Sequence, residues 1–182
     1  MVFIVVSGEV QTGKTTFVKN LAFDLWTRQI SAGGVVSLKY WVSPTDTGYK
    51  AYDLMTFDTA VIVTRNSELG ERIGENHFMV TKGFDFGKQA VNRSLQNCTV
   101  TFIDEVGQLE LRKQAGLYST VRSATQSTKH VVVVVRRKLL PLLETVFPSL
   151  TPVVVFVDHG QDERMQEWLK VRDLLLQSTP TC

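Results

Sequence analysis

The feature that most constrains this chain is a glycine-rich segment placed directly after a short apolar run. Its eight residues match the pattern GxxxxGK[ST] at every fixed position: Gly8-Glu9-Val10-Gln11-Thr12-Gly13-Lys14-Thr15. The apolar run at residues 2–6 predicts a buried strand, and residues 15–29 carry a helical pattern. Backbone N–H groups in such a loop, with the positive end of the following helix, surround a phosphate group. The sequence therefore predicts a phosphate-binding loop.

Each residue type in this loop has a physical role in the prediction. The two glycines permit backbone angles and a close approach that a Cβ would forbid. Lys14 is expected to reach the β- and γ-phosphates, and Thr15 to ligate Mg²⁺ through its hydroxyl. Thr16 follows within the same binding segment. The alternative is a glycine turn with a solvated lysine, which the flanking strand and helix disfavour.

Two acidic residues, Asp104 and Glu105, follow a second apolar run at residues 100–103. Ligands of open α/β sheets bind at the carboxyl ends of the strands, so this pair is expected beside the phosphates. Asp104 is predicted to hold Mg²⁺ through its water shell, and Glu105 to polarise an attacking water. The alternative is that the two acids begin a loop or cap a helix.

The rest of the chain predicts an α/β fold. Apolar runs rich in β-branched residues predict buried parallel strands at residues 2–6, 100–103, 131–135 and 153–157. Helical patterns occupy residues 15–29, 84–96, 112–126, 138–146 and 161–177, with Trp168 expected in the core. Residues 33–82 instead predict an antiparallel extension, built on a hairpin around turn formers at 43–48. We predict a single domain over residues 1–182, with 33–82 as an extension of its sheet.

Composition excludes several classes of partner. Twenty Lys and Arg residues against 18 Asp and Glu give a net charge of +2, which indicates neither a nucleic-acid nor a membrane partner. Cys98 and Cys182 are too few for a disulfide framework and form no zinc-binding pattern. The apolar run at residues 2–6 is too short for a secretory signal. A cytoplasmic location is expected, and nothing in the sequence requires an oligomer, so we expect a monomer.

The segment after the second strand resembles a known family. It reads Ile103-Asp104-Glu105-Val106-Gly107-Gln108-Leu109-Glu110-Leu111. This closely resembles the IDEIGKMEL signature of the small P-loop nucleoside-triphosphatases first described from thermophiles, which include the vertebrate cancer-related nucleoside-triphosphatase. Inside the phosphate loop the family often has Pro-Pro-Gly, where this chain has Glu9-Val10-Gln11 at variable positions of the pattern. The family's Asn-Arg pair after the last strand has no equivalent among residues 158–164.

The resemblance implies a P-loop NTPase fold with a RecA-like core, and Mg²⁺-dependent conversion of ATP, GTP, CTP and UTP to the diphosphate and phosphate. It also implies nucleotide contacts from the phosphate loop, Asp104 and Glu105, with Gly107 allowing the next turn to approach closely. From the residues themselves, Arg136 directly after the strand at 131–135 is a candidate to stabilise the transferred charge, or else a solvated helix start.

Two other functions stay open at this point. One is a kinase that passes the γ-phosphoryl group to a small molecule, a nucleotide or a polynucleotide end. The other is a nucleotide-dependent switch. Glu105 favours hydrolysis or the switch, because an attacking water needs orientation whereas a kinase acceptor site largely excludes water.

Overall fold

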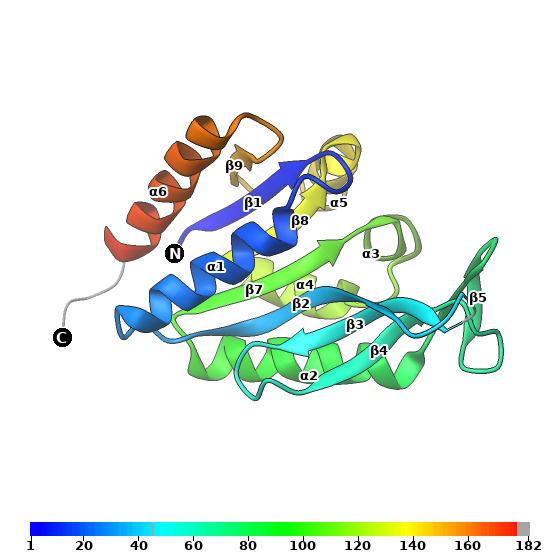
Figure 1. Cartoon of the computed structure of the whole chain (residues 1–182). Helices are drawn as coiled ribbons and strands as arrows, with labels where there is room; N and C mark the ends of the chain where they lie inside the picture. Colours follow the sequence, from blue (N-terminus) through cyan, green and yellow to red (C-terminus); the bar gives the residue numbers. More distant parts are fainter. Residues whose placement is uncertain (45, 178–182) are drawn as a thin grey trace.

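Within the part of the chain that the structure describes, the strands form one mixed sheet of nine (Figure 1). The computed structural model describes residues 1–44 and 46–177, so Cys182 and position 45 of the predicted turn lie outside it. The strands are β1 (Phe3–Gly8), β2 (Ala32–Trp41), β3 (Thr47–Asp53), β4 (Thr59–Thr64), β5 (Glu71–Gly74), β6 (His77–Met79), β7 (Val100–Val106), β8 (His130–Arg136) and β9 (Val153–Phe156). Their order across the sheet is β5-β6-β4-β3-β2-β7-β8-β1-β9.

The five strands β2-β7-β8-β1-β9 form the parallel part of the sheet. Strand β1, which leads into the phosphate loop, pairs with β8 on one side and β9 on the other. Strand β7, which carries the two acids, lies beyond β8. Because parallel strands present their carboxyl ends at one edge, the phosphate loop and the acids lie at the same edge of the sheet.

Helices cover both faces of the sheet (Figure 1). They are α1 (Lys14–Thr27), α2 (Thr81–Asn97), α3 (Gln108–Lys113), α4 (Tyr118–Thr125), the 3₁₀ turn η1 (Arg137–Leu139), α5 (Leu140–Val146) and α6 (Gln161–Gln177). Alternate strand residues face opposite sides, so Val6 belongs to the core under α1 and α6, whereas Val5 belongs to the core under α2, α4 and α5. The predicted α/β fold with helices on both faces is confirmed.

The predicted hairpin extension is present, and β2 links it to the parallel part. Strand β2 runs parallel to β7 from Ala32 to Val35 and antiparallel to β3 from Val35 to Trp41. Strands β4, β6 and β5 continue the sheet in antiparallel fashion. The sequence did not predict β5, because this edge strand has only four residues and two of them are charged.

Other elements differ from the sequence-based expectation. The single helix expected at residues 112–126 is wrong: α3 and α4 occupy this region, separated by a turn in which Gln114 has φ 49° and Gly116 has φ 60°. Left-handed backbone of this kind ends a helix. Strand β7 continues to Val106 instead of ending at residue 103. Within the described residues, no helix has both the length and the apolar character needed to cross a membrane.

Candidate functional site

The predicted phosphate loop joins the end of β1 to the start of α1. Strand β1 ends at Gly8 and α1 begins at Lys14, which leaves residues 9–13 as the loop. Gly13 has φ 84°, a left-handed conformation that glycine adopts without strain and that lets the helix begin at the next residue. Gln11 also has a positive φ, at 65°. This tight connection aims the free N–H groups at the start of α1 toward the edge of the sheet.

The side chain of Lys14 is held over the loop by a backbone carbonyl group of the loop. Its ammonium group donates a hydrogen bond to the carbonyl oxygen of Glu9, which also accepts the hydroxyl of Thr12 at 2.9 Å. Burial lowers the pKa of Lys14; the charge of Glu105 opposes this shift, and that of Arg136 adds to it. A phosphate group can replace the Glu9 carbonyl as the partner of this ammonium, so the loop is suited to an anion.

Asp104 is buried at the carboxyl edge of β7, with 1% of its surface exposed. One carboxylate oxygen accepts the hydroxyl of Thr15 at 2.7 Å and the backbone N–H of Ser37 at 3.0 Å. The other accepts the backbone N–H of Glu105 at 2.9 Å. Burial raises the pKa of Asp104 to about 6, and the neighbouring charge of Glu105 adds to the shift. Asp104 thus ties β7 to α1 and β2 at the phosphate loop.

A β-bulge sets the direction of Glu105. The pairing of β7 with β8 shifts register between Ile103 and Val106, and Glu105 has φ 61°. A bulge of this kind turns a side chain out of the regular alternation of a strand. The Glu105 carboxylate lies 3.4 Å from a guanidinium nitrogen of Arg136 at the end of β8. The two adjacent acids therefore differ: Asp104 is buried and fully hydrogen-bonded, whereas Glu105 is accessible.

These residues surround a cavity of about 300 Å³, which we call the phosphate cavity. Its lining residues come from the loop, α1, β2, β3, β7 and β8: Val10, Gln11, Gly13, Lys14, Thr15, Ser37, Leu38, Lys39, Tyr49, Glu105 and Arg136. The structure thus brings together residues from four strands, a helix and the loop, which are far apart in sequence. Among the predicted residues, Gly8, Glu9 and Thr12 shape the loop without lining this cavity.

Thr15 and Asp104 are the residues that could hold a cation. Their hydroxyl and carboxylate oxygens are hard donors of the kind that Mg²⁺ prefers. The hydrogen bond between Thr15 and Asp104 shows that these oxygens lie close to each other. No cluster of three or more His, Cys, Asp or Glu residues suited to a metal occurs in the part of the chain that the structure describes. A cation here would take its other ligands from phosphate oxygens and water.

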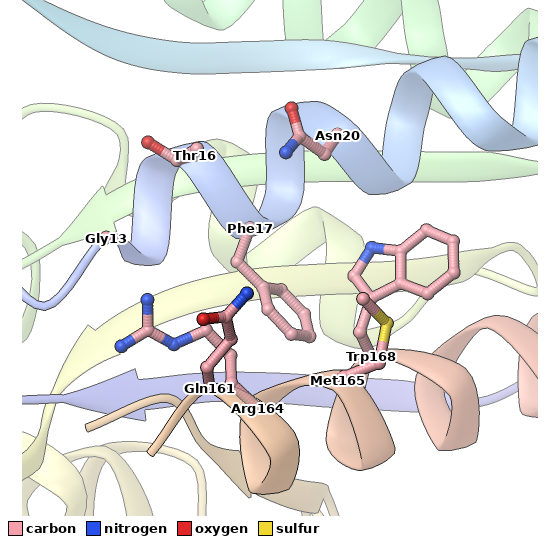
Figure 2. Close-up of a pocket in the computed structure, with 8 residues that line it drawn as sticks. All are labelled: Gly13, Thr16, Phe17, Asn20, Gln161, Arg164, Met165 and Trp168. Carbon is pink, nitrogen blue, oxygen red and sulfur yellow. The ribbon is translucent and has the colours of Figure 1, made fainter. Parts of the chain in front are cut away.

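A second cavity, of about 460 Å³, lies between α1 and α6 (Figure 2). It shares Gly13 with the phosphate cavity, and Thr16, a predicted binding residue, lines it. Phe17 projects from α1 toward α6, and Arg164 reaches from α6 toward the loop (Figure 2). We call this the α1/α6 cavity. Its lining residues are Gly13, Thr16, Phe17, Asn20, Gln161, Arg164, Met165 and Trp168.

Sequence reasoning missed this cavity. Trp168, expected in the core, is only partly buried and lines the cavity, because α6 packs over the sheet mainly through Val171 and Leu175. Arg164 was not singled out, yet its Nε is buried without a hydrogen-bond partner in the described structure. No pattern in the sequence signals that α1 and α6 meet, since strands β2 to β9 lie between the two helices in the chain.

The last acid of the 103–111 segment, Glu110, is structural. This buried carboxylate accepts the backbone N–H of Gly107 at 2.9 Å and that of Leu117 at 3.1 Å. Burial raises the pKa of Glu110, and the two hydrogen bonds oppose the shift. Gly107 is the N-cap residue of α3 and does not line the phosphate cavity. A Cβ there would meet only ordinary contacts, at 3.5 Å or more, so packing does not require a glycine.

Of the three basic residues Arg136, Arg137 and Lys138 at the end of β8, only Arg136 lines the phosphate cavity. The guanidinium of Arg137 lies 2.7 Å from Asp158 and 4.5 Å from the ring centroid of Phe156. Those contacts hold Arg137 beside β9. The geometry therefore favours Arg136 over its neighbour as the cation next to Glu105.

The family model and the named relatives that the chain matches all point to the same protein family. Residues 3–169 match the model of the NTPase family. The chain is 31% identical over 138 residues to a protein named nucleoside-triphosphatase THEP1 from Methanosarcina barkeri, covering 75% of this chain and 78% of that one. It is 25% identical over 172 residues to the protein of the same name from Methanothermobacter thermautotrophicus, covering 94% and 95% of the two chains.

Two solved structures share the fold. THEP1 from Aquifex aeolicus aligns with a TM-score of 0.73 at 19% identity, over 95% of this chain and 98% of that one. A human cancer-related nucleoside triphosphatase aligns with a TM-score of 0.74 at 16% identity, over 99% and 100%. Since the family model spans nearly the whole chain, with the phosphate loop and the acids of β7 inside the match, the chain belongs to the NTPase family.

Proposed function

We propose that the protein hydrolyses nucleoside triphosphates, with Mg²⁺, to the diphosphate and phosphate, and accepts ATP, GTP, CTP and UTP. The observation that carries this proposal is the meeting of Lys14, Thr15 and Glu105 in one cavity beside the buried Asp104. Together they offer a cation for phosphate oxygens, a pair of oxygen donors for Mg²⁺ and an accessible carboxylate. The names of the sequence relatives support the same reaction.

The phosphate end of the substrate is held by charge and by backbone N–H groups. The β-phosphate lies in the loop at the start of α1, where the helix dipole favours an anion. The ammonium of Lys14 leaves the Glu9 carbonyl and contacts the β- and γ-phosphates. Mg²⁺, held by Thr15 and by Asp104 through water, would neutralise charge on the same phosphates. These contacts expose the γ-phosphorus to attack on the side of Glu105.

Glu105 is the group that acts on water. Its carboxylate accepts a proton from a water molecule in the phosphate cavity, which raises the nucleophilicity of that water toward the γ-phosphorus. Arg136, 3.4 Å from the same carboxylate, lies where negative charge builds up on the transferred group. The buried Asp104 cannot take this role, because both its oxygens already accept hydrogen bonds from the protein.

We infer that the nucleoside part of the substrate binds in the α1/α6 cavity. This cavity meets the phosphate cavity at Gly13, so a nucleotide bound by its phosphates can extend into it. Trp168 and Phe17 offer aromatic surface for any base, while Asn20 and Gln161 offer amides that both donate and accept hydrogen bonds. Surfaces of this kind tolerate purines and pyrimidines alike, which agrees with a broad range of substrates.

The test measures phosphate release from each of the four triphosphates with Mg²⁺ and after chelation by EDTA. Glu105→Gln is expected to lower kcat by a factor of about 10² to 10⁴ while nucleotide binding persists, because the amide cannot accept the proton. Lys14→Ala is expected to weaken nucleotide binding as well as turnover. Glu144→Gln, an exposed glutamate on α5, serves as the matched control and should resemble the wild type.

Two results would contradict the proposal. One is a wild-type protein that binds nucleotide with Mg²⁺ but releases no phosphate above background. The other is a Glu105→Gln variant with undiminished turnover, which would remove Glu105 from its assigned role. Calorimetric titration with a non-hydrolysable ATP analogue separates loss of binding from loss of chemistry.

A further inference from the structure

A third cavity, of about 400 Å³, adjoins the phosphate cavity. Glu105 and Arg136 line both cavities, so the two spaces meet at the carboxylate that acts on the attacking group. We call the third cavity the side chamber. The antiparallel extension lines it on one side, and α2 and the start of α3 line it on the other. Hydrolysis as described above gives no role to the apolar side chains that β4, β5 and α2 contribute to this chamber.

The side chamber is much larger than hydrolysis requires. One attacking water occupies about 30 Å³, whereas pockets of roughly 300 to 1,000 Å³ are typical of small-molecule sites. The chamber falls in that range. A site built only to orient water gains nothing from a partly open pocket of this size next to its reactive carboxylate.

The walls of the chamber are mostly apolar. Strand β4 supplies Ile62 and β5 supplies Ile73, opposite Phe84, Leu109 and Leu117 from the helical side. His77 and Gln108 add hydrogen-bonding groups. A predominantly apolar lining that includes some polar groups is typical of pockets that bind the hydrophobic body of a ligand and orient its reactive group.

The charges at the chamber argue against an anionic ligand. Three carboxylates line it, Asp104, Glu105 and Glu110, against the single guanidinium of Arg136, which already contacts Glu105. A second phosphate-bearing molecule would place its charge among these acids, and the described lining residues offer no further Lys or Arg to pair with it. A neutral molecule meets no such cost.

We propose that the side chamber binds a neutral, ring-bearing alcohol and that the protein transfers the γ-phosphoryl group of its nucleotide to the hydroxyl of this alcohol. The inference rests on the nucleotide site described under the proposed function. The hydroxyl oxygen forms a bond to the γ-phosphorus, and the bond from that phosphorus to the β,γ-bridging oxygen breaks. Glu105 takes the hydroxyl proton, and the nucleoside diphosphate leaves. Water takes the place of the alcohol when the chamber holds none.

The test follows the label of γ-³²P-ATP in the presence of Mg²⁺ and a panel of neutral ring-bearing alcohols: adenosine, uridine, pyridoxine and benzyl alcohol. Chromatography separates labelled organic phosphate from inorganic phosphate. At least one alcohol is expected to become labelled, with an equal fall in the yield of inorganic phosphate. If none of the four is labelled, the proposal is overturned. Release of inorganic phosphate in the same samples reports separately on the proposed hydrolysis.

A pair of variants tests whether transfer takes place in the side chamber. Ile73→Trp fills the chamber from the edge strand β5, while Leu69→Trp adds the same side chain at an exposed position just before β5. Ile73→Trp is expected to lower transfer to the alcohol by about tenfold or more and to change phosphate release by less than about twofold. Leu69→Trp should match the wild type in both. Equal transfer by Ile73→Trp and the wild type would overturn the assignment.

Discussion

Glu105 has a backbone conformation that few residues other than glycine adopt. Its φ of 61° lies in the left-handed region, next to a shift of register in β7. Strain of this kind persists where the surrounding structure enforces it, and it concentrates at functional sites. Asp104, one residue earlier, is fully buried and ties the strand to α1 and β2. The bulge is therefore what gives two neighbouring acids two different environments.

The raised pKa of Asp104 predicts a pH dependence of stability in the nucleotide-free, metal-free protein. Its pKa is about 6 in the folded state, against 3.8 for an unperturbed aspartate. Between these values the folded state binds more protons than the unfolded state, so the unfolding free energy falls as pH rises from about 4 to about 6. This is opposite in sign to the usual contribution of a salt-bridged aspartate. The expected loss from this group is on the order of 3 kcal/mol.

Asp104→Asn isolates this contribution, because the amide does not titrate. Urea unfolding of both proteins in EDTA at pH 4.5 and pH 7.5 gives the measurement. The wild type is expected to lose stability relative to the variant on going to the higher pH. A difference between the two proteins that stays constant across this range would show that Asp104 titrates normally.

At the scale of elements, β2 joins the parallel sheet to the antiparallel extension, and one glycine permits that contact. Gly34 has φ 103°, and a Cβ there would lie 2.1 Å from the carbonyl oxygen of Phe102 on β7. No side chain fits in that space. Three residues later, Ser37 donates its backbone N–H to Asp104, so the position of β2 also affects the candidate site.

Gly34→Ala is expected to destabilise the protein by roughly 3 kcal/mol, because the added Cβ forces β2 away from β7 and strains the backbone. Gly160→Ala is the matched control, since a Cβ at Gly160 would have no heavy atom within 4 Å. Urea unfolding measures both. A Gly34→Ala protein as stable as the Gly160→Ala protein would mean that β2 moves at no cost.

At the scale of the whole molecule, the fold brings the first and last helices together beside the phosphate loop (Figure 1). The α1/α6 cavity that results lies next to Gly13 and presents Trp168 and Arg164 from α6 (Figure 2). On the other side, the extension lines the side chamber together with α2 and α3. The phosphate cavity thus has two large neighbouring spaces: one meets it at Gly13, where we propose that the nucleoside binds, and the other meets it at Glu105 and Arg136.

Trp168→Ala tests the placement of the nucleoside. Loss of a stacked base costs about 1 to 3 kcal/mol, so KM for ATP is expected to rise by roughly tenfold with little change in kcat. Hydrolysis of inorganic tripolyphosphate, which has no nucleoside, should not change. Trp41→Ala, at a side chain that is 70% exposed on the hairpin, is the control. A parallel loss of activity toward ATP and tripolyphosphate would place the effect at the phosphate end instead.

The sequence determined the local features of this protein. The loop at residues 8–15 needs only its glycines, its lysine and the flanking strand and helix, all of which are adjacent in the chain. The buried strands were recognisable from uninterrupted β-branched runs such as 131–135. The hairpin followed from turn formers between two extended segments. These features depend on short-range propensity and on periodicity, which a sequence displays directly.

Tertiary structure decided how distant residues meet. The sheet order places β8 between β1 and β7, which brings Arg136 to Glu105 and Asp104 to Thr15. The bulge at Glu105, the short edge strand β5 and the exposure of Trp168 all depend on which neighbours pack against them, and no local pattern encodes those neighbours. The strand, loop and helix at residues 3–27 could therefore be predicted from sequence alone. The two cavities beside the loop exist only because the tertiary structure packs α6 and the antiparallel extension next to it.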